Sequence, residues 1–320
     1  MIVVCGEALF DVFATQEAAA GIDLAARQGG SPFNLATGVA RLGGKASFFG
    51  GLAHDMFGRK LHAALAAEGV DLSAAPRPEA PTALMMVSLD EKGVPHYAFY
   101  GSATAERMVG LEDLQRVPME AEAIHVGSYC MVVEPVASTL RALVERQRGH
   151  SLIAYDPNVR LTIEPHVDVW RDALQWMLAR SDVLKISEED IHAICPALQV
   201  DAFVRQALDA GVALVVVTRG EHGVVAATPG LPSLVLPAVP VTVADTVGAG
   251  DTFQAGLLSW LQRHGYLRRS AIEGLTREAL AEALQFAARA AAITCSRQGA
   301  DLPYLNEVVN EAIAASPRMK

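Results

Sequence analysis

Residues 241–256 carry the strongest chemical signal in this 320-residue chain. They read Val-Thr-Val-Ala-Asp-Thr-Val-Gly-Ala-Gly-Asp-Thr-Phe-Gln-Ala-Gly, so a β-branched run ends in Gly248-Ala249-Gly250 and Asp251 opens an apolar, helix-like segment. Small residues at a helix start let backbone N–H groups approach an anion, and the helix dipole favours negative charge there. Asp251 stands where a carboxylate can take a proton from a hydroxyl that attacks a phosphate. The stretch predicts phosphoryl transfer to an alcohol, the alternative being a plain helix start with an acidic first turn.

A second glycine element lies early in the chain, at Gly29-Gly30-Ser31-Pro32-Phe33-Asn34. Ser31 suits an N-cap and Pro32 the first helical position, which places Asn34 in the first turn. Gly29 and Gly30 allow a substrate to approach the backbone closely, and the Asn34 amide can bond two hydroxyls. The alternative is a capped helix that binds nothing.

Two charged side chains follow predicted strands. Asp11 comes after the strand-like residues 3–9, where a carboxylate can accept hydrogen bonds from two sugar hydroxyls; the alternative is a turn aspartate. Arg160 ends Asp156-Pro157-Asn158-Val159-Arg160, and it can reach a ligand from the carboxyl edge of the sheet. The alternative is that Arg160 forms an ion pair at the surface. The histidines are scattered, and we assign none of them to a metal.

The composition narrows the function classes. The chain is 51% hydrophobic and carries a net charge of −10 without a basic block, so nucleic-acid binding is not expected. An anionic nucleotide must therefore be held locally, by backbone amides, Lys185, Arg219 or Mg²⁺. The four cysteines, Cys5, Cys130, Cys195 and Cys295, are widely spaced, which indicates reduced thiols.

The sequence shows no targeting or membrane segment. The first residues read as a strand rather than a signal peptide, and no run approaches 18 apolar residues free of charge. We therefore expect a cytoplasmic protein that is not bound to a membrane.

Apolar β-rich runs alternate with helical patterns along most of the chain. The pattern predicts strands over 1–5, 46–50, 123–126, 152–155, 183–186 and 213–218, and helices over 32–42, 58–67, 135–148, 169–179, 201–210, 251–263 and 277–295. Such alternation is typical of an α/β fold with a doubly wound, mostly parallel sheet between helices, in one domain spanning 1–320. Ligands then bind at the carboxyl ends of the strands.

Two segments break this alternation. Residues 82–90 and 96–101 flank a glycine-containing turn at 91–95 and read as a β-hairpin, while residues 10–28 have mixed polarity. Together they predict a small sheet apart from the main core, either a lid built from about 10–28 and 82–105 or an inert extension. Residues 229–240 read as a connection with a short strand.

Over essentially its whole length, the chain resembles the ribokinase-like, PfkB-type carbohydrate kinases. The N-terminal motif is carried by Gly29-Gly30-Ser31-Pro32-Phe33-Asn34-Leu35-Ala36, Arg41-Leu42-Gly43, Phe49-Gly50-Gly51 and Asp55-x-x-Gly58, and the C-terminal motif by residues 245–253. Within the family the chain is most similar to fructokinases. That similarity is carried by residues 6–11, Phe99-Tyr100, Ala105-Glu106, 156–161 and 184–189.

The resemblance implies a role for each site residue. Asp251 is the catalytic base, and the amides of Gly248, Ala249 and Gly250 form the anion hole. The sugar side comprises Asp11, Gly29, Gly30, Asn34, Phe99 and Arg160, and the ATP side comprises Lys185, Ser187, Thr218, Gly220 and Gly223. Potassium is expected near Asp245 and Val247, magnesium near Asp190, and a homodimer contact through the lid.

Two positions depart from the family pattern. The Asn-x-x-Glu expected on the Mg²⁺ side is replaced by Ser187-Glu188-Glu189-Asp190, which keeps a carboxylate one methylene shorter. Val247 replaces the threonine of the cation site, which is harmless if that residue contributes only its main-chain carbonyl.

The expected reaction is MgATP-dependent phosphorylation of fructose, at O6. The alternative acceptor is 2-keto-3-deoxygluconate, an acid that Arg160 can pair with, and other sugars of the family rank lower. An alternative of another class is a non-catalytic sensor that binds sugar or nucleotide, which has no need of a base at Asp251. The sequence leaves open whether Phe99 or Tyr100 faces the pocket, since a one-residue slip exchanges them.

Overall fold

The main sheet is the frame of the molecule. The computed structural model describes residues 1–18, 20–89 and 95–315. The strands of this sheet are β1 (Ile2–Cys5), β4 (Ala46–Phe49), β7 (Ala123–Gly127), β8 (Leu152–Asp156), β9 (Val183–Ser187), β10 (Leu214–Thr218), β11 (Val224–Thr228) and β12 (Leu231–Leu236). They lie in the order β12-β11-β10-β9-β8-β7-β1-β4. Neighbours from β4 to β10 pair in parallel, and β11 and β12 add an antiparallel edge.

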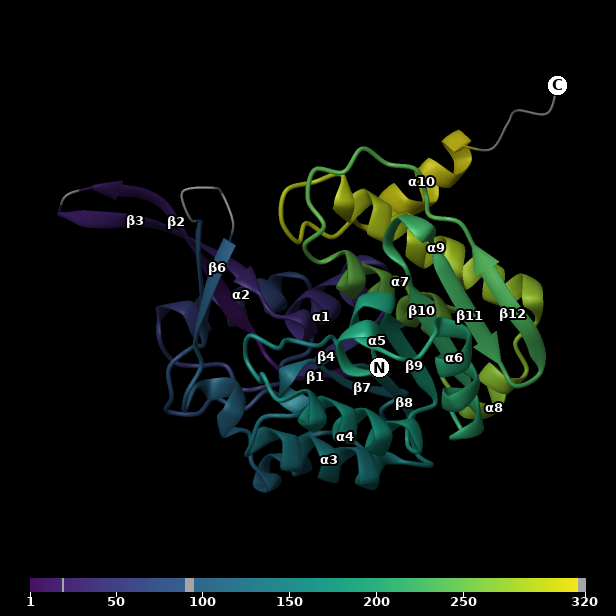
Figure 1. Ribbon diagram of the computed structural model, residues 1–320. Helices are drawn as coiled ribbons and strands as arrows, with labels where there is room; N and C mark the ends of the chain where they lie inside the picture. The colour runs from purple at the N-terminus through teal and green to yellow at the C-terminus, as the bar shows by residue number, and fades with distance from the viewer. Residues whose placement is uncertain (19, 90–94, 316–320) are drawn as a thin grey trace.

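Helices cover both faces of this sheet (Figure 1). They are α1 (Ser31–Arg41), α2 (Met56–Ala67), α3 (Val136–Gln147), α4 (Val167–Leu178), α5 (Glu188–Ile194), α6 (Val200–Asp209), α7 (Ala249–Arg263), α8 (Arg269–Glu273), α9 (Arg277–Cys295) and α10 (Leu305–Ala315). One apolar core joins a sheet face to α1, α2, α7 and α9, and a second joins the other face to α3, α4, α5 and α6. This is the doubly wound α/β arrangement that the alternating pattern predicts.

The first strand shows why both faces must be covered. Ile2 and Val4 lie in one core, while Val3 and Cys5 lie in the other, and all four are fully buried. Successive side chains of a strand point to opposite faces, so a continuous apolar run requires helices on both sides.

Small residues bring three helices close together above one sheet face. A Cβ on Gly38 of α1 would lie 2.7 Å from the Ala255 Cβ of α7, and a Cβ on Gly256 would lie 2.8 Å from the Ala287 Cα of α9. The helices therefore pack almost backbone to backbone. This packing fixes the position of the α7 N-terminus relative to that of α1.

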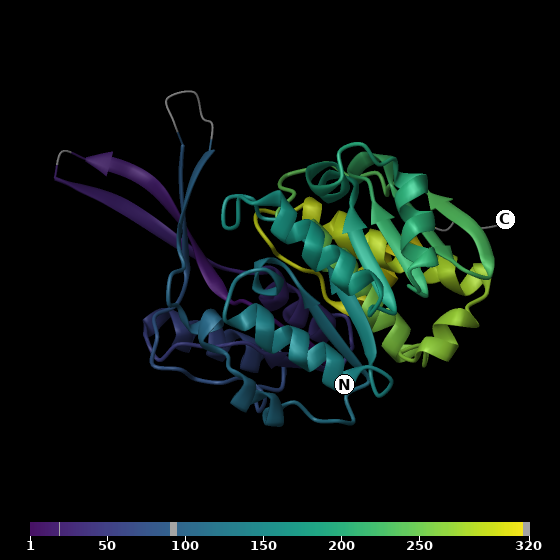
Figure 2. The same ribbon diagram turned by 60° about the horizontal axis from the view of Figure 1, so that its bottom comes forward.

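A second sheet projects from this body (Figures 1 and 2). It contains β2 (Leu9–Ala18), β3 (Gly21–Gly29), β5 (Leu84–Leu89) and β6 (Pro95–Tyr100), in the order β3-β2-β5-β6. Within the predicted segment 10–28, the described residues thus form two antiparallel strands, paired from Leu9–Gly29 to Ala18–Gly21, and residue 19 lies outside the described part of the chain. The predicted hairpin after residue 82 is present as β5 and β6, but residues 90–94 of its turn lie outside the described part of the chain.

Short 3₁₀ segments complete the fold. The predicted N-cap of α1 is the one assignment in this part of the fold that is wrong. Single 3₁₀ turns are η1 (Ala105–Met108), η2 (Leu111–Arg116), η3 (Tyr129–Met131) and η4 (Gly220–His222). The N-cap of α1 is Gly30 rather than Ser31, because the helix begins one residue earlier than predicted. No helix among the described residues is long and apolar enough to cross a membrane.

Gly256→Ala is expected to lower the free energy of unfolding by about 1–3 kcal/mol, because the added methyl group must push the α9 backbone away. Urea denaturation of both proteins measures the change. Gly230→Ala is the matched control, since nothing lies within 4 Å of its Cβ position. Equal stability of Gly256→Ala and the natural protein contradicts the close packing of α7 on α9.

Candidate active site

The N-termini of α1 and α7 meet at one carboxylate. Asp251, in the first turn of α7, accepts a hydrogen bond from Ser31 Oγ at 2.6 Å through Oδ1 and from Asn34 Nδ2 at 2.8 Å through Oδ2. The two glycine elements of the sequence are thus joined across more than 200 residues. Both carboxylate oxygens are held in place, which fixes their direction at the helix start.

Backbone N–H groups at the start of α7 lie next to this carboxylate in the chain. Gly248 has φ +78°, the left-handed conformation that suits glycine, and it forms the N-cap of α7. The Ala249 N–H donates to the Thr246 carbonyl at 3.2 Å, so it is already engaged. Over the described residues, the N–H groups of Gly248, Gly250 and Asp251 have no hydrogen-bond partner. Of the three predicted anion-hole amides, those of Gly248 and Gly250 are therefore free, and the Asp251 amide is a further free donor.

A buried ion pair lies beneath this helix start. Lys185 Nζ lies 2.8 Å from Asp156 Oδ2, and both side chains are buried. A Cβ on Gly250 would come within 3.2 Å of the same Nζ, so the ammonium lies close to the start of α7. Burial disfavours the charged lysine, but the carboxylates of Asp156, Asp190 and Asp251 outweigh it and raise the lysine pKa. A permanent positive charge therefore faces the free amides.

The predicted magnesium side lies next to this ion pair. Asp190 is in the first turn of α5, near enough to act on both Asp156 and Lys185, and its Oδ1 accepts the Val159 N–H at 3.0 Å. The Ser187 hydroxyl is the N-cap of α5 and accepts the Asp190 N–H. Asp156 Oδ1 is buried without a hydrogen-bond partner, which is compatible with a cation bound next to this carboxylate. Within the described ranges, no three acidic, His or Cys side chains are grouped to hold a metal alone.

The predicted sugar side is formed by Asp11, the Gly29–Gly30 turn and Arg160. A Cβ on Gly29 would lie 2.4 Å from Asp11 Oδ2, and a Cβ on Gly30 (φ +103°) would lie 2.8 Å from the Glu7 carbonyl. Burial raises the pKa of Asp11 to about 6, opposed by the positive charge of Arg160. The carboxylate thus lies against the glycine turn within electrostatic range of the guanidinium.

The structure separates the two aromatic residues of β6. The Phe99 ring packs edge-on against Tyr129, with ring centroids 5.3 Å apart, whereas Tyr100 is 64% exposed. The register pairs Met85 with Phe99, so Phe99 faces the main body. Its contact with a sugar remains a prediction.

The remaining nucleotide-side residues lie at neighbouring strand ends. Thr218 pairs with Ser187 at the carboxyl ends of β10 and β9. Gly220 and Gly223 lie in the turn to β11, where the Arg219 N–H donates to the Gly223 carbonyl at 2.8 Å. No hydrogen bond or ion pair among the described residues links this turn to Asp251, so a shared ligand is what would connect them.

The predicted cation site lies just before α7. Asp245 accepts the Val247 N–H at 3.1 Å and the Gly299 N–H at 2.9 Å. The Val247 side chain is 52% exposed. The aspartate therefore ties the loop before α7 to residue 299, and Val247 leaves that arrangement intact.

Sequence reasoning missed three polar residues around the site. Ser31 was expected to cap a helix, but its hydroxyl binds Asp251. Glu7 and His125 are buried with unpartnered polar atoms, and burial lowers the pKa of His125 to about 3, so it is neutral. For His125 the sequence signal is a polar residue inside the apolar strand β7, whereas Glu7 lies between β1 and β2, within the residues 6–11 that carry the similarity to fructokinases.

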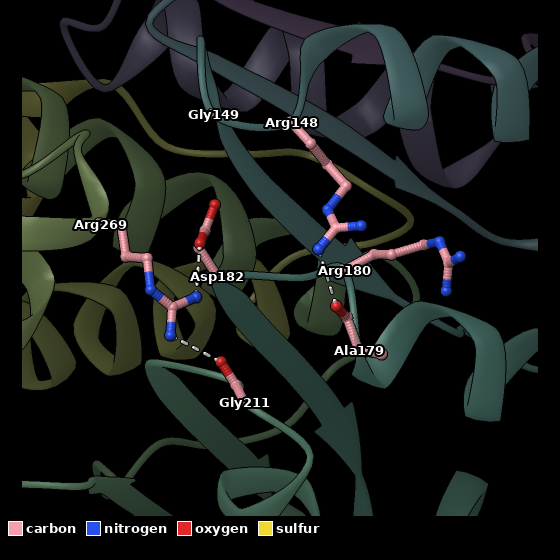
Figure 3. A pocket seen from close by; sticks show the side chains of 7 residues that line it. All are labelled: Arg148, Gly149, Ala179, Arg180, Asp182, Gly211 and Arg269. Atoms are coloured by element: carbon pink, nitrogen blue, oxygen red, sulfur yellow. Dashed lines mark hydrogen bonds and ion pairs between the residues drawn. The ribbon is translucent and has the colours of Figure 1, made fainter.

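A cavity of about 390 Å³ lies at the opposite, amino-terminal edge of the sheet (Figure 3). Its arginines are engaged at the ends of helices and loops: Arg148 donates to the Ala179 carbonyl, and Arg269 to Asp182 and the Gly211 carbonyl. Guanidinium groups at helix C-termini satisfy exposed carbonyls. The cavity contains none of the predicted site residues, and these bonds account for its charge.

Most of the chain matches a known protein family. The family model of pfkB family carbohydrate kinases matches residues 1–307. A fructokinase of Rhizobium leguminosarum bv. trifolii is 35% identical over 280 residues, which is 88% of this chain and 85% of that protein.

Two solved structures have the same fold as this chain over nearly its whole length. A fructokinase from Xylella fastidiosa with bound ATP is 28% identical, with a TM-score of 0.88 over 98% of each chain. A fructokinase from Vibrio cholerae O395, in a form with fructose, ADP and calcium ion bound, is 25% identical, with a TM-score of 0.80 over 97% of each chain.

Gly29→Ala is expected to raise the KM for the acceptor alcohol about 10- to 100-fold, because its methyl group displaces the Asp11 carboxylate. The KM for the phosphate donor should stay the same, and steady-state kinetics measures both. Gly21→Ala, in the same strand with open space at its Cβ, is the matched control. An unchanged acceptor KM in Gly29→Ala contradicts a binding role for this carboxylate.

Proposed function

The chain belongs to the pfkB family of carbohydrate kinases and is a phosphotransferase with an alcohol group as acceptor, and we propose that it transfers the γ-phosphate of ATP to O6 of fructose. The observation that carries this proposal is the Asp251 carboxylate, fixed by Ser31 and Asn34 beside free backbone amides. The fructokinase relatives, one with ATP and one with fructose and ADP, support the choice of substrates.

Asp251 acts as the base in this proposal. Both of its oxygens already accept a hydrogen bond, from Ser31 and from Asn34, yet each keeps a second acceptor position. The attacking hydroxyl donates to one of these positions and passes its proton to the carboxylate as its oxygen bonds to phosphorus. Holding the carboxylate, the sugar and the phosphate in line supplies most of the rate enhancement.

The charge of the transferring group is met by three donors of the chain. The N–H groups of Gly250 and Asp251 point from the helix start, and the Lys185 ammonium stands behind Gly250. Fixed donors aimed at the developing charge stabilise the transition state without reorganisation. Mg²⁺ bound with ATP neutralises further phosphate charge, and Asp190 is the residue that would hold it, with water and phosphate oxygens as the remaining ligands.

The other assignments belong to the same proposal. Asp11, Gly29, Gly30, Asn34 and Arg160 bind the sugar, and Thr218, Gly220 and Gly223 line the ATP side. K⁺ binds near Asp245 and the Val247 carbonyl. The β3-β2-β5-β6 sheet closes over the site as a lid and forms a homodimer contact, and the protein is cytoplasmic. All of these points stay predictions.

A second acceptor is favoured by one observation. The Arg160 side chain is exposed, and among the described residues its only hydrogen bond is from Nη1 to the Val159 carbonyl. A guanidinium with free donors can pair with a carboxylate, which 2-keto-3-deoxygluconate has and fructose lacks.

We expect ADP to form from ATP only when fructose is added, with lower kcat/KM for 2-keto-3-deoxygluconate, ribose and glucose. A coupled assay of ADP measures this, and an isomerase–dehydrogenase couple specific for fructose 6-phosphate identifies the product. A preference for 2-keto-3-deoxygluconate replaces the proposal by its alternative. Sugar binding without ADP formation contradicts the kinase assignment.

Asp251→Asn is expected to lower kcat about 10²- to 10⁴-fold, the range for loss of a general base, with the fold retained. Stopped ADP assays and a thermal melt measure the two effects. Glu278→Gln is the matched control, because Glu278 is an exposed carboxylate in the first turn of α9. Near-full turnover by Asp251→Asn excludes the base role.

A further inference from the structure

Arg41 belongs to the N-terminal motif of the sequence, but the proposed reaction gives it no role. It is the last residue of α1, and its side chain is 19% exposed. Its Nε and Nη2 donate to Oε1 of Glu68, the C-cap of α2, at 2.9 and 2.6 Å, and its Nη1 donates to the Leu302 carbonyl at 2.7 Å. Its Cζ lies 4.8 Å from the centroid of the Tyr304 ring. A largely buried guanidinium thus joins α1 and α2 to residues 296–304, the segment between α9 and α10.

One side of this segment packs against α1. Leu302 is 1% exposed, and a Cβ on Gly38 of α1 would lie 2.5 Å from its Cδ2. Arg41 Nη1 also lies 3.4 Å from Oδ1 of Asp301, whose N–H donates to the Gly299 carbonyl at 2.9 Å. These residues therefore form a turn whose last residue is held against α1 by Arg41.

The other side of the same turn packs against the start of α7. A Cβ on Gly248, the N-cap of α7, would lie 2.7 Å from the Ala300 Cβ, so Ala300 packs directly on the Gly248 backbone. The Gly299 N–H donates to Asp245 Oδ2 at 2.9 Å, and Asp245 in turn accepts the Val247 N–H. The position of the turn therefore sets the position of the loop that leads into α7.

We propose that Arg41 is a positioning residue for the start of α7. By holding Leu302 against α1, it keeps Ala300 against Gly248. This inference rests on the proposed function, in which the amides at the start of α7 receive the transferring phosphoryl group. Fixed donors stabilise the transition state only while they are aimed at the developing charge, so a shift of this turn lowers the rate of the chemical step rather than the affinity for the sugar.

Arg41→Gln removes the guanidinium. We expect kcat to fall about tenfold with the KM for fructose nearly unchanged, because a misplaced group costs up to about 100-fold in rate and the Cys295 carbonyl still ties the Asp245 N–H to α9. Arg41→Lys should lose kcat about threefold, since an ammonium keeps the charge but lacks the planar fork that binds Glu68 and the Leu302 carbonyl together. Steady-state kinetics measures these constants below the melting temperature of each variant. An unchanged kcat in Arg41→Gln, or a raised KM for fructose alone, overturns the proposal.

Arg180→Gln is the matched control, because Arg180 makes the same kinds of contact. Its Nε donates to Glu145 at 2.6 Å, its Nη1 donates to the Trp176 carbonyl at 3.0 Å, and its guanidinium lies over the Trp176 ring. Its side chain is 24% exposed, close to the value for Arg41, but it lines the cavity at the amino-terminal edge of the sheet (Figure 3). Arg180→Gln should leave kcat unchanged. An equal fall of kcat in both variants indicates a general loss of stability and overturns the proposal.

Amide hydrogen exchange, measured by NMR, tests the same link without turnover. In Arg41→Gln, the Gly299 and Asp301 amides should exchange about tenfold faster than in the natural protein, because the turn that holds their hydrogen bonds is loosened. Arg180→Gln should leave both rates unchanged. Unchanged exchange in Arg41→Gln overturns the positioning role, whichever sugar the protein phosphorylates. Faster exchange in a protein that forms no ADP with fructose supports the link and contradicts the proposed substrate.

Discussion

The structure depends on the two hydrogen bonds that Asp251 accepts from Ser31 and Asn34. They join the start of α1 to the start of α7, two helices that lie side by side because Gly38 and Ala255 permit a close approach. Both helix dipoles are then directed at one place, beside the carboxyl ends of β1 and β9. A carboxylate, free amides and a buried ammonium share this place because helix packing, not the local sequence, brings them together.

The charged groups around the site determine whether it can accept an anion. The chain carries a net charge of −10, and acids are dense around the proposed phosphate position. An anion is acceptable there only because Lys185, fixed by Asp156, faces the unpaired amides of Gly250 and Asp251. The same acids hold Lys185 in its charged form. In the proposed reaction, sugar and phosphate meet between Asp11 and Arg160 on one side and the Asp156–Lys185 ion pair on the other.

Much of this could be predicted from the sequence, because the apolar strands and amphipathic helices have strong local periodicity. Helix α9 begins and ends where predicted, and the glycine signals located the turns that meet at Asp251. The features that could not be predicted from the sequence depend on tertiary contacts. The shift of the α1 N-cap from Ser31 to Gly30 follows from the bond to Asp251, and the pairing of Lys185 with Asp156 requires neighbouring strands. The burial of Glu7, whose Oε2 has no hydrogen-bond partner, depends on tertiary packing that the local pattern does not show.

The central claim is that Asp251 takes a proton from the sugar while the amides beside it receive the phosphate. A crystal structure with fructose and a non-hydrolysable ATP analogue tests this most directly. We predict that the terminal phosphorus lies against the Gly250 and Asp251 N–H groups, with the fructose 6-hydroxyl within hydrogen-bond distance of the Asp251 carboxylate. A terminal phosphate bound elsewhere, or a sugar with no hydroxyl near Asp251, contradicts the account.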